Sequence, residues 1–171
     1  MPEQEHPRAM TFFRMDDAPR LEDDGMMATD MGSIDPAVFT SFDFGQFLAG
    51  QTVKVLFKGA GPEGFSLVHA RFEPGFRLFR HSHSSDCLYV VIAGEARMGT
   101  RVLRPGDGLF VRAEAHYTYT AGPDGVEVLE FRAATSFDIK FRDTTVADWK
   151  PVADAVREHG ESWVKSQAPV A

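Results

Sequence analysis

RHSHSSDCLYVVIAGE, residues 80–95, places two histidines directly before a continuous apolar run. The run at 87–94 has the length and the β-branched content of a strand that is buried on both faces. His81 and His83 are one residue apart, so on a strand both imidazole rings point to the same face. Two neutral imidazoles on one face form half of a divalent metal site, or the polar floor of a metal-free pocket. This stretch therefore predicts a buried sheet with a site at its edge.

Short apolar segments separated by turn residues flank this stretch on both sides. TVKVLF (52–57) comes first, and FSLVHARF (65–72) follows after the turn cluster KGAGPEG (58–64). About eight such segments recur at roughly ten-residue spacing, with no helical period between them. This pattern predicts an all-β fold, an antiparallel jelly roll or barrel.

The two ends of the chain have different patterns. Residues 1–36 show neither a helical nor a strand period, which predicts an irregular acidic arm. This arm is either flexible or packed on a partner subunit through its Met residues, Phe12 and Phe13. Residues 146–171 follow the predicted barrel at 37–145 and favour one amphipathic helix, with Asp148 as its N-cap and Pro151 in its first turn. The apolar side of that helix comprises Trp149, Val152, Val156 and Trp163.

Composition limits the classes of function. The net charge of -7 and a pI near 5.3 argue against binding to a phosphate backbone, so no nucleic-acid partner is expected. Neither a membrane-spanning run nor a secretory signal is recognisable, and no membrane partner is expected. The single Cys rules out an intramolecular disulfide and suits a reducing compartment. We therefore expect a cytoplasmic protein.

The stretch GFRLFRHSHSSDCLYVVIAG resembles the first motif of the cupin superfamily, in which Gly75, His81, His83 and Gly94 fall at the family spacing. GDGLFVRAEAHYTYT, from Gly106, resembles a degenerate copy of the second motif. The resemblance covers roughly residues 45–140 and implies a small single-domain cupin, a double-stranded β-helix with its pocket inside. Cupins commonly hold a divalent metal on three His and one Glu. They include dioxygenases, isomerases, lyases, cyclases and non-enzymatic binding proteins.

Two positions depart from the family pattern. Cys87 stands where the family has its Glu, and Tyr117 stands at the strict position of the third histidine, with His116 one residue before it. Cys87 is either a soft thiolate ligand or a small buried hydrophobe. A one-residue offset reverses the face of a side chain, so either a local bulge brings His116 into the pocket or Tyr117 faces it instead.

The resemblance and the residues together give two candidate functions. The first is a metal-dependent enzyme (oxygenase, lyase or isomerase) with Fe, Zn, Ni or Mn on His81 and His83, acting on a small apolar or aromatic molecule. In this case Tyr117 is a candidate proton donor. The second is a metal-free binding or sensing protein with a vestigial site. An inward His116 favours the enzyme, whereas an inward Tyr117 favours the binder.

Further residues are predicted around the pocket. Tyr89 and Phe110 are candidates for its walls, and His69 is a third if Leu67 and Arg71 share its face, although a core or surface histidine is the simpler interpretation. Open barrels with exposed edge strands often pair, so we expect a homodimer that binds a small molecule.

Overall fold

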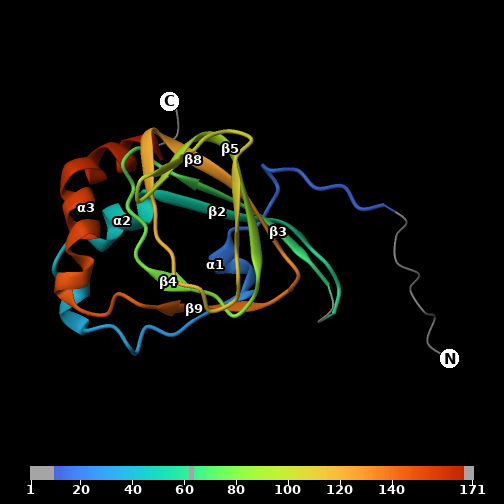
Figure 1. Ribbon diagram of the computed structural model, residues 1–171, viewed down its shortest axis with the longest axis horizontal. Helices are drawn as coiled ribbons and strands as arrows, with labels where there is room; N and C mark the ends of the chain where they lie inside the picture. Colours follow the sequence, from blue (N-terminus) through green and yellow to red (C-terminus); the bar gives the residue numbers. More distant parts are fainter. Residues whose placement is uncertain (1–9, 62–63, 168–171) are drawn as a thin grey trace.

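The strands of this computed structural model, which describes residues 10–61 and 64–167, form two sheets (Figure 1). The larger, six-stranded sheet has the order β2-β3-β8-β5-β6, and β7 pairs with β5 beside this path. Its strands are β2 (Gln51–Lys58), β3 (Ser66–Phe72), β5 (Cys87–Met98), β6 (Arg101–Leu103), β7 (Gly108–Val111) and β8 (Thr120–Arg132). The smaller sheet has the order β1-β9-β4, with strands β1 (Met27–Thr29), β4 (His81–Ser82) and β9 (Phe137–Phe141).

The predicted all-β fold with antiparallel strands and one C-terminal helix is confirmed, and two details differ. Within the described residues the strands form two separate sheets and not one closed barrel. The pairing of β1 with β9 is parallel, whereas all other strand pairs in these sheets are antiparallel.

The apolar run of the opening stretch forms the long central strand β5. Cys87, Tyr89 and Val91 alternate with outward-facing residues and are buried in the core. Gly94 has a positive φ of 65°, and a Cβ there would collide with the carbonyl oxygen of Gly125 on the neighbouring strand β8. The register of β5 against β8 shifts on either side of this glycine, so β5 bends at Gly94 and continues as a second half.

The C-terminal helix α3 (Val146–Ser166) begins earlier than the sequence predicts. Thr145 is the N-cap, and Asp148 is the third residue of a capping box with it. Asp148 is therefore not the N-cap, and Pro151 lies inside the helix and not in its first turn. The predicted apolar side is buried, and the Trp149 ring stacks on Phe79 with ring centroids 5.0 Å apart. The helix thus packs on its own chain, beside α2 (Phe44–Ala49) (Figure 1).

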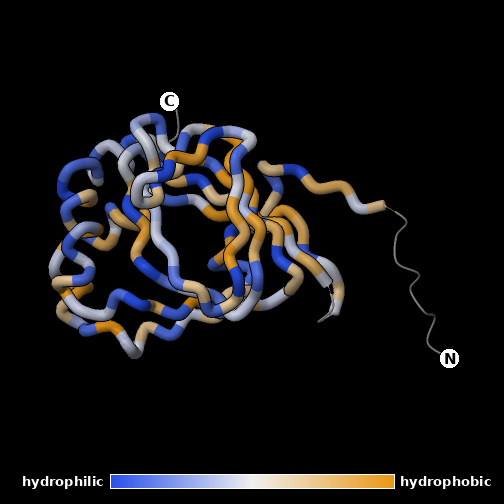
Figure 2. The backbone as a smooth tube through the Cα atoms, in the orientation of Figure 1, coloured by the Kyte–Doolittle hydropathy of each residue, from blue (hydrophilic) through white to orange (hydrophobic). Residues whose placement is uncertain are grey.

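The segment before residue 36 is partly ordered into elements, unlike the irregular arm that was predicted. Residues 1–9 lie outside the described part. The rest includes α1 (Leu21–Asp24) and β1, and a 3-10 helix follows at Pro36–Thr40. Met27 and Met31 pack against the main core of this same chain, whereas Phe12 and Phe13 are exposed. Figure 2 shows apolar residues concentrated in the strands and interspersed with polar ones along α3. No helix in the described residues has both the length and the apolar character needed to cross a membrane.

Candidate functional site

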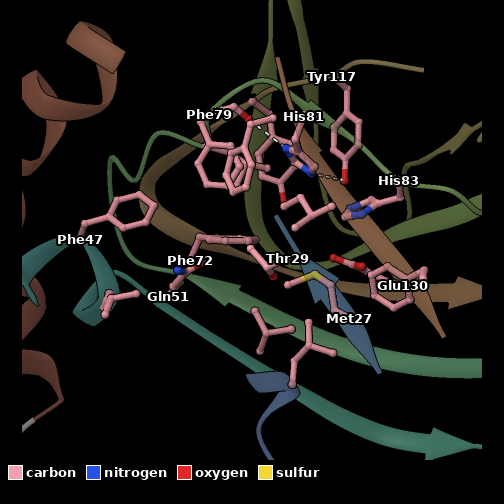
Figure 3. A pocket seen from close by; sticks show the side chains of 18 of the residues that line it. Met27, Thr29, Phe47, Gln51, Phe72, Phe79, His81, His83, Tyr117 and Glu130 are labelled. Atoms are coloured by element: carbon pink, nitrogen blue, oxygen red, sulfur yellow. Dashed lines mark hydrogen bonds between the residues drawn. The ribbon is translucent and has the colours of Figure 1, made fainter. Parts of the chain in front are cut away.

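A cavity of about 260 Å³ lies between the two sheets and is lined mainly by apolar side chains (Figure 3). β1 contributes Met27 and Thr29, and the helical elements contribute Phe47 and Trp149. The polar lining groups include His81, His83, Tyr117, Glu130 and Arg132. A mainly apolar cavity with a few converging polar groups is typical of a small-molecule site.

Backbone pairing decides whether His116 or Tyr117 faces this cavity. The N–H groups of His81 and Tyr117 each donate to the carbonyl oxygen of the other residue, at 3.2 and 3.0 Å. Directly paired residues in an antiparallel ladder project to the same face, so Tyr117 shares the cavity with His81. His116 is exposed and does not line the cavity. Of the two alternatives that the sequence left open, the structure therefore has Tyr117 facing inward.

Tyr117 and its neighbours form a hydrogen-bond chain whose direction is fixed at both ends. His81 Nδ1 donates to the carbonyl oxygen of Phe79 (3.0 Å), so Nε2 of the neutral ring accepts from the Tyr117 hydroxyl (3.0 Å) (Figure 3). The Tyr89 hydroxyl then donates to the Tyr117 oxygen (2.5 Å) and accepts from Arg132 Nη2 (3.1 Å). Arginine can only donate and a carbonyl can only accept, so the protons of the chain have one consistent arrangement.

Both histidines are neutral at neutral pH. Burial lowers the pKa of His81 to about 4 and that of His83 to about 3, with the charge of Arg132 as a further cause for His83. His83 Nδ1 donates to the carbonyl oxygen of Asp138 (2.7 Å), which leaves Nε2 as an acceptor. The two rings lie close together, with centroids 4.8 Å apart.

Arg132 is the most deeply buried charged group in the site, with 1% of its surface exposed. Its Nη2 donates to Glu130 Oε2 at 2.6 Å, and its guanidinium lies 4.2 Å from the centroid of the Phe137 ring. Burial opposes the charge, but the Glu130 carboxylate more than offsets this effect, so the pKa of Arg132 is raised. The residue therefore stays charged inside the molecule.

The residues do not fit the four-ligand metal centre that the resemblance implies. The described part of the chain contains no group of three or more His, Cys, Asp or Glu side chains placed to hold one ion. Cys87 is buried in β5 but does not line the cavity, and burial raises the pKa of its thiol to about 12. The Nε2 atom of His81 accepts a hydrogen bond from the Tyr117 hydroxyl.

The three predicted wall residues lie in different places. Tyr89 is buried and does not line the cavity, and its hydroxyl is hydrogen-bonded to that of Tyr117, which does. Phe110 is 59% exposed. His69 is buried on β3 and bonds through Nε2 to Glu127 (2.9 Å), away from the cavity lining.

Glu130 and Arg132 were not predicted as site residues, although the sequence contains a signal for them. In VEVLEFR (126–132), Val126 and Val128 are buried, and Glu130 and Arg132 follow at the same period of two. Their phase places both charged side chains on the inner face and Phe131 on the outer one. Met27 and Thr29 were also missed, because β1 has only three residues and no recognisable alternation.

Comparisons with known proteins identify the fold. The polyketide cyclase RemF from Streptomyces resistomycificus superposes with a TM-score of 0.51 at 14% identity, over 67% of this chain and 83% of the cyclase. An RmlC-like cupin from Shewanella frigidimarina NCIMB 400 gives 0.44 at 22% identity, over 52% and 78% of the two chains. KdgF from Halomonas sp. gives 0.43 at 22% identity, over 49% and 79%. No protein-family profile and no curated protein sequence matches. The chain has the cupin fold, and at these identities the likeness extends to the fold alone.

Proposed function

We propose that this protein binds a small apolar or aromatic molecule in the cavity between its sheets, and that binding requires no metal ion. The observation that carries the proposal is the bond from the Tyr117 hydroxyl to His81 Nε2. This bond occupies the atom that a metal would need, and burial raises the pKa of Tyr117, so its hydroxyl remains a donor.

The cavity itself supports binding. Its walls are mainly aromatic and aliphatic, and its polar groups are fixed by hydrogen bonds to the backbone and to each other. Such preorganisation lowers the entropic cost of binding because the polar groups do not have to reorient. The Tyr117 proton is donated to His81, so the proposal gives Tyr117 a positioning role and not the role of a proton donor to a substrate.

A cavity-filling variant tests the proposal. Thr29→Trp introduces a bulky ring from β1 into the cavity, and Val164→Trp adds the same ring at an exposed position on α3 as a control. A small aromatic probe such as benzyl alcohol should raise the Tm of the parent and the control, because a ligand that binds only the folded state stabilises it. The increase should be lost in Thr29→Trp. An equal increase in all three proteins would contradict binding in this cavity.

A metal-dependent enzyme is the second candidate, and one observation favours it. Both histidines donate from Nδ1 to backbone carbonyl oxygens, which is the tautomer that leaves Nε2 available to a metal. Elemental analysis of the freshly purified parent, His83→Ala and Cys87→Ser separates the candidates. We expect less than stoichiometric metal in all three. Stoichiometric metal in the parent that falls in His83→Ala would instead support the enzyme.

A further inference from the structure

The guanidinium of Arg132 has hydrogen-bond capacity that the described chain does not use. Nε and Nη1 are fully buried and have no hydrogen-bond partner, although Nη2 bonds to both Glu130 and Tyr89. Three N–H donors of this charged group therefore have no hydrogen-bond acceptor. A buried polar group that is left without a hydrogen-bond partner destabilises the folded state, and a charged one does so more strongly.

The surroundings of Arg132 indicate what would satisfy these donors. Among the described residues that line the cavity, Arg132 is the only cationic side chain and Glu130 is the only acidic one. Glu130 bonds to a single nitrogen, so it neutralises the charge without occupying the rest of the guanidinium. The neutral histidines add no further positive charge, and His83 Nε2 is an acceptor beside the same space.

The position of the guanidinium is rigid. The centroid of the Phe137 ring lies 4.2 Å from the central carbon of the guanidinium. The hydroxyl of Tyr89, on the neighbouring strand β5, accepts a hydrogen bond from Nη2. A planar, fixed guanidinium with free N–H donors suits the two oxygens of a carboxylate, which arginine binds through paired hydrogen bonds.

We infer that the ligand of this cavity is an apolar or aromatic carboxylate, with its carboxylate on the free donors of Arg132 and its apolar body between Phe47, Met27 and Ile139. This inference rests on the proposed function and specifies its ligand class. The cavity of about 260 Å³ equals the volume of roughly nine waters at ~30 Å³ each, so a ligand of about ten non-hydrogen atoms fits.

A matched pair of probes tests the inference. 3-Phenylpropionate and its neutral amide have the same shape and differ in charge, and isothermal titration calorimetry measures both affinities. The parent should bind the acid at least about tenfold more tightly than the amide, because a site built for one polar group discriminates against its analogue. Glu130→Gln should tighten the acid about threefold or more relative to the amide, since it removes a negative charge that repels the carboxylate of the ligand.

The variant that removes Arg132 is designed to fold. Arg132→Met combined with Glu130→Gln removes both charges of the buried pair, so neither is left alone, and circular dichroism checks the fold. This double variant should bind acid and amide equally, whereas Arg101→Met, an equivalent change on an exposed residue of β6, should keep the preference.

The outcomes separate this inference from the proposed function. If the parent binds the amide as well as the acid, or if the double variant keeps its preference for the acid, the carboxylate assignment is wrong and the binding cavity stands. If neither probe binds to the parent, both proposals are wrong.

Discussion

Around the paired ends of β5 and β8, the six-stranded sheet has buried polar side chains on its inner face and exposed apolar ones on its outer face. On the inner face, β8 and β5 carry Arg132 and Tyr89, whose polar groups are buried. On the outer face, Leu88 lies directly between Phe131 and Phe110 on the neighbouring strands, and all three are substantially exposed. Phe65 extends this row, with its ring centroid 5.2 Å from that of Phe131.

This difference indicates what each face is for. A buried polar group is destabilising unless it has a hydrogen-bond partner, which supports the polar ligand group that we propose for the inner face. A contiguous exposed apolar surface usually marks an interaction site, and the outer face therefore suits the homodimer expected from the sequence. The following experiments change either the cavity side or the outer face of the sheet, one at a time.

The largest expected effect is the loss of stability in acid, which comes from two cavity-lining histidines, His81 on β4 and His83 directly after it. The folded-state pKa values of about 4 for His81 and 3 for His83 lie below the unfolded value of 6.5. Between these values the unfolded state binds more protons, so the free energy of unfolding falls as the pH drops from 6.5 towards 4, by on the order of 5 kcal/mol. Urea unfolding at several pH values measures this. In the double variant His81→Gln/His83→Gln, the free energy of unfolding should depend much less on pH. An unchanged pH dependence would contradict the assignment of this effect to the two histidines.

The single substitution Arg132→Met should destabilise the protein by about 3 kcal/mol at pH 7. It leaves the Glu130 carboxylate buried without its partner, and breaking one side of a buried ion pair is costly. Urea unfolding should show that adding Glu130→Gln recovers most of this loss. A double variant that is as unstable as the single one would mean that packing, and not charge, explains the effect.

On the outer face, Phe131→Lys should weaken self-association by about 2 kcal/mol, roughly thirtyfold in Kd, without altering the affinity for a ligand in the cavity. Analytical ultracentrifugation over a concentration series measures the change. Val164→Lys, at an exposed apolar position on α3, is the control and should behave like the parent. A parent that is monomeric at every concentration would contradict the homodimer.

The smallest effect is expected at Cys87, which lies on the inner side of β5 but outside the cavity lining. Cys87→Ala should cost about 1 kcal/mol, because it removes a single buried sulfur atom, and it should leave ligand affinity unchanged. Burial raises the pKa of this thiol to about 12, so the folded protein should resist iodoacetamide. Rapid alkylation, or a clear loss of ligand affinity, would show that the thiol is part of the site.

Much of the fold follows from short-range patterns in the sequence. Turn residues separate the strands, and the resemblance to the first cupin motif, carried by Gly75, His81, His83 and Gly94, predicts the fold. Elements of three to six residues, such as β1 and α2, are stabilised by tertiary packing and carry too little periodicity to be recognised.

The site was harder to predict because it depends on register. The choice between His116 and Tyr117 is decided by a turn that includes Glu114, a non-glycine residue with a positive φ of 65°, whose N–H bonds to the carbonyl oxygen of His83 (2.8 Å). No local rule predicts such a conformation for glutamate. Arg132 and Glu130 were predictable from their phase with Val126 and Val128, but charged residues in a strand are normally assigned to the solvent side.

The parallel pairing of β1 with β9 has a consequence for the order of folding. Met27 lies beside Phe137, so the chain must close a loop that spans most of its length before this wall of the cavity exists. Contacts of such high sequence separation form late, because the entropy of loop closure is lost before they contribute stability. We therefore expect the sheet to assemble first and the capacity to bind a ligand to appear only afterwards. A nascent or truncated chain without β1 would have the remaining sheet but would lack this wall of the cavity.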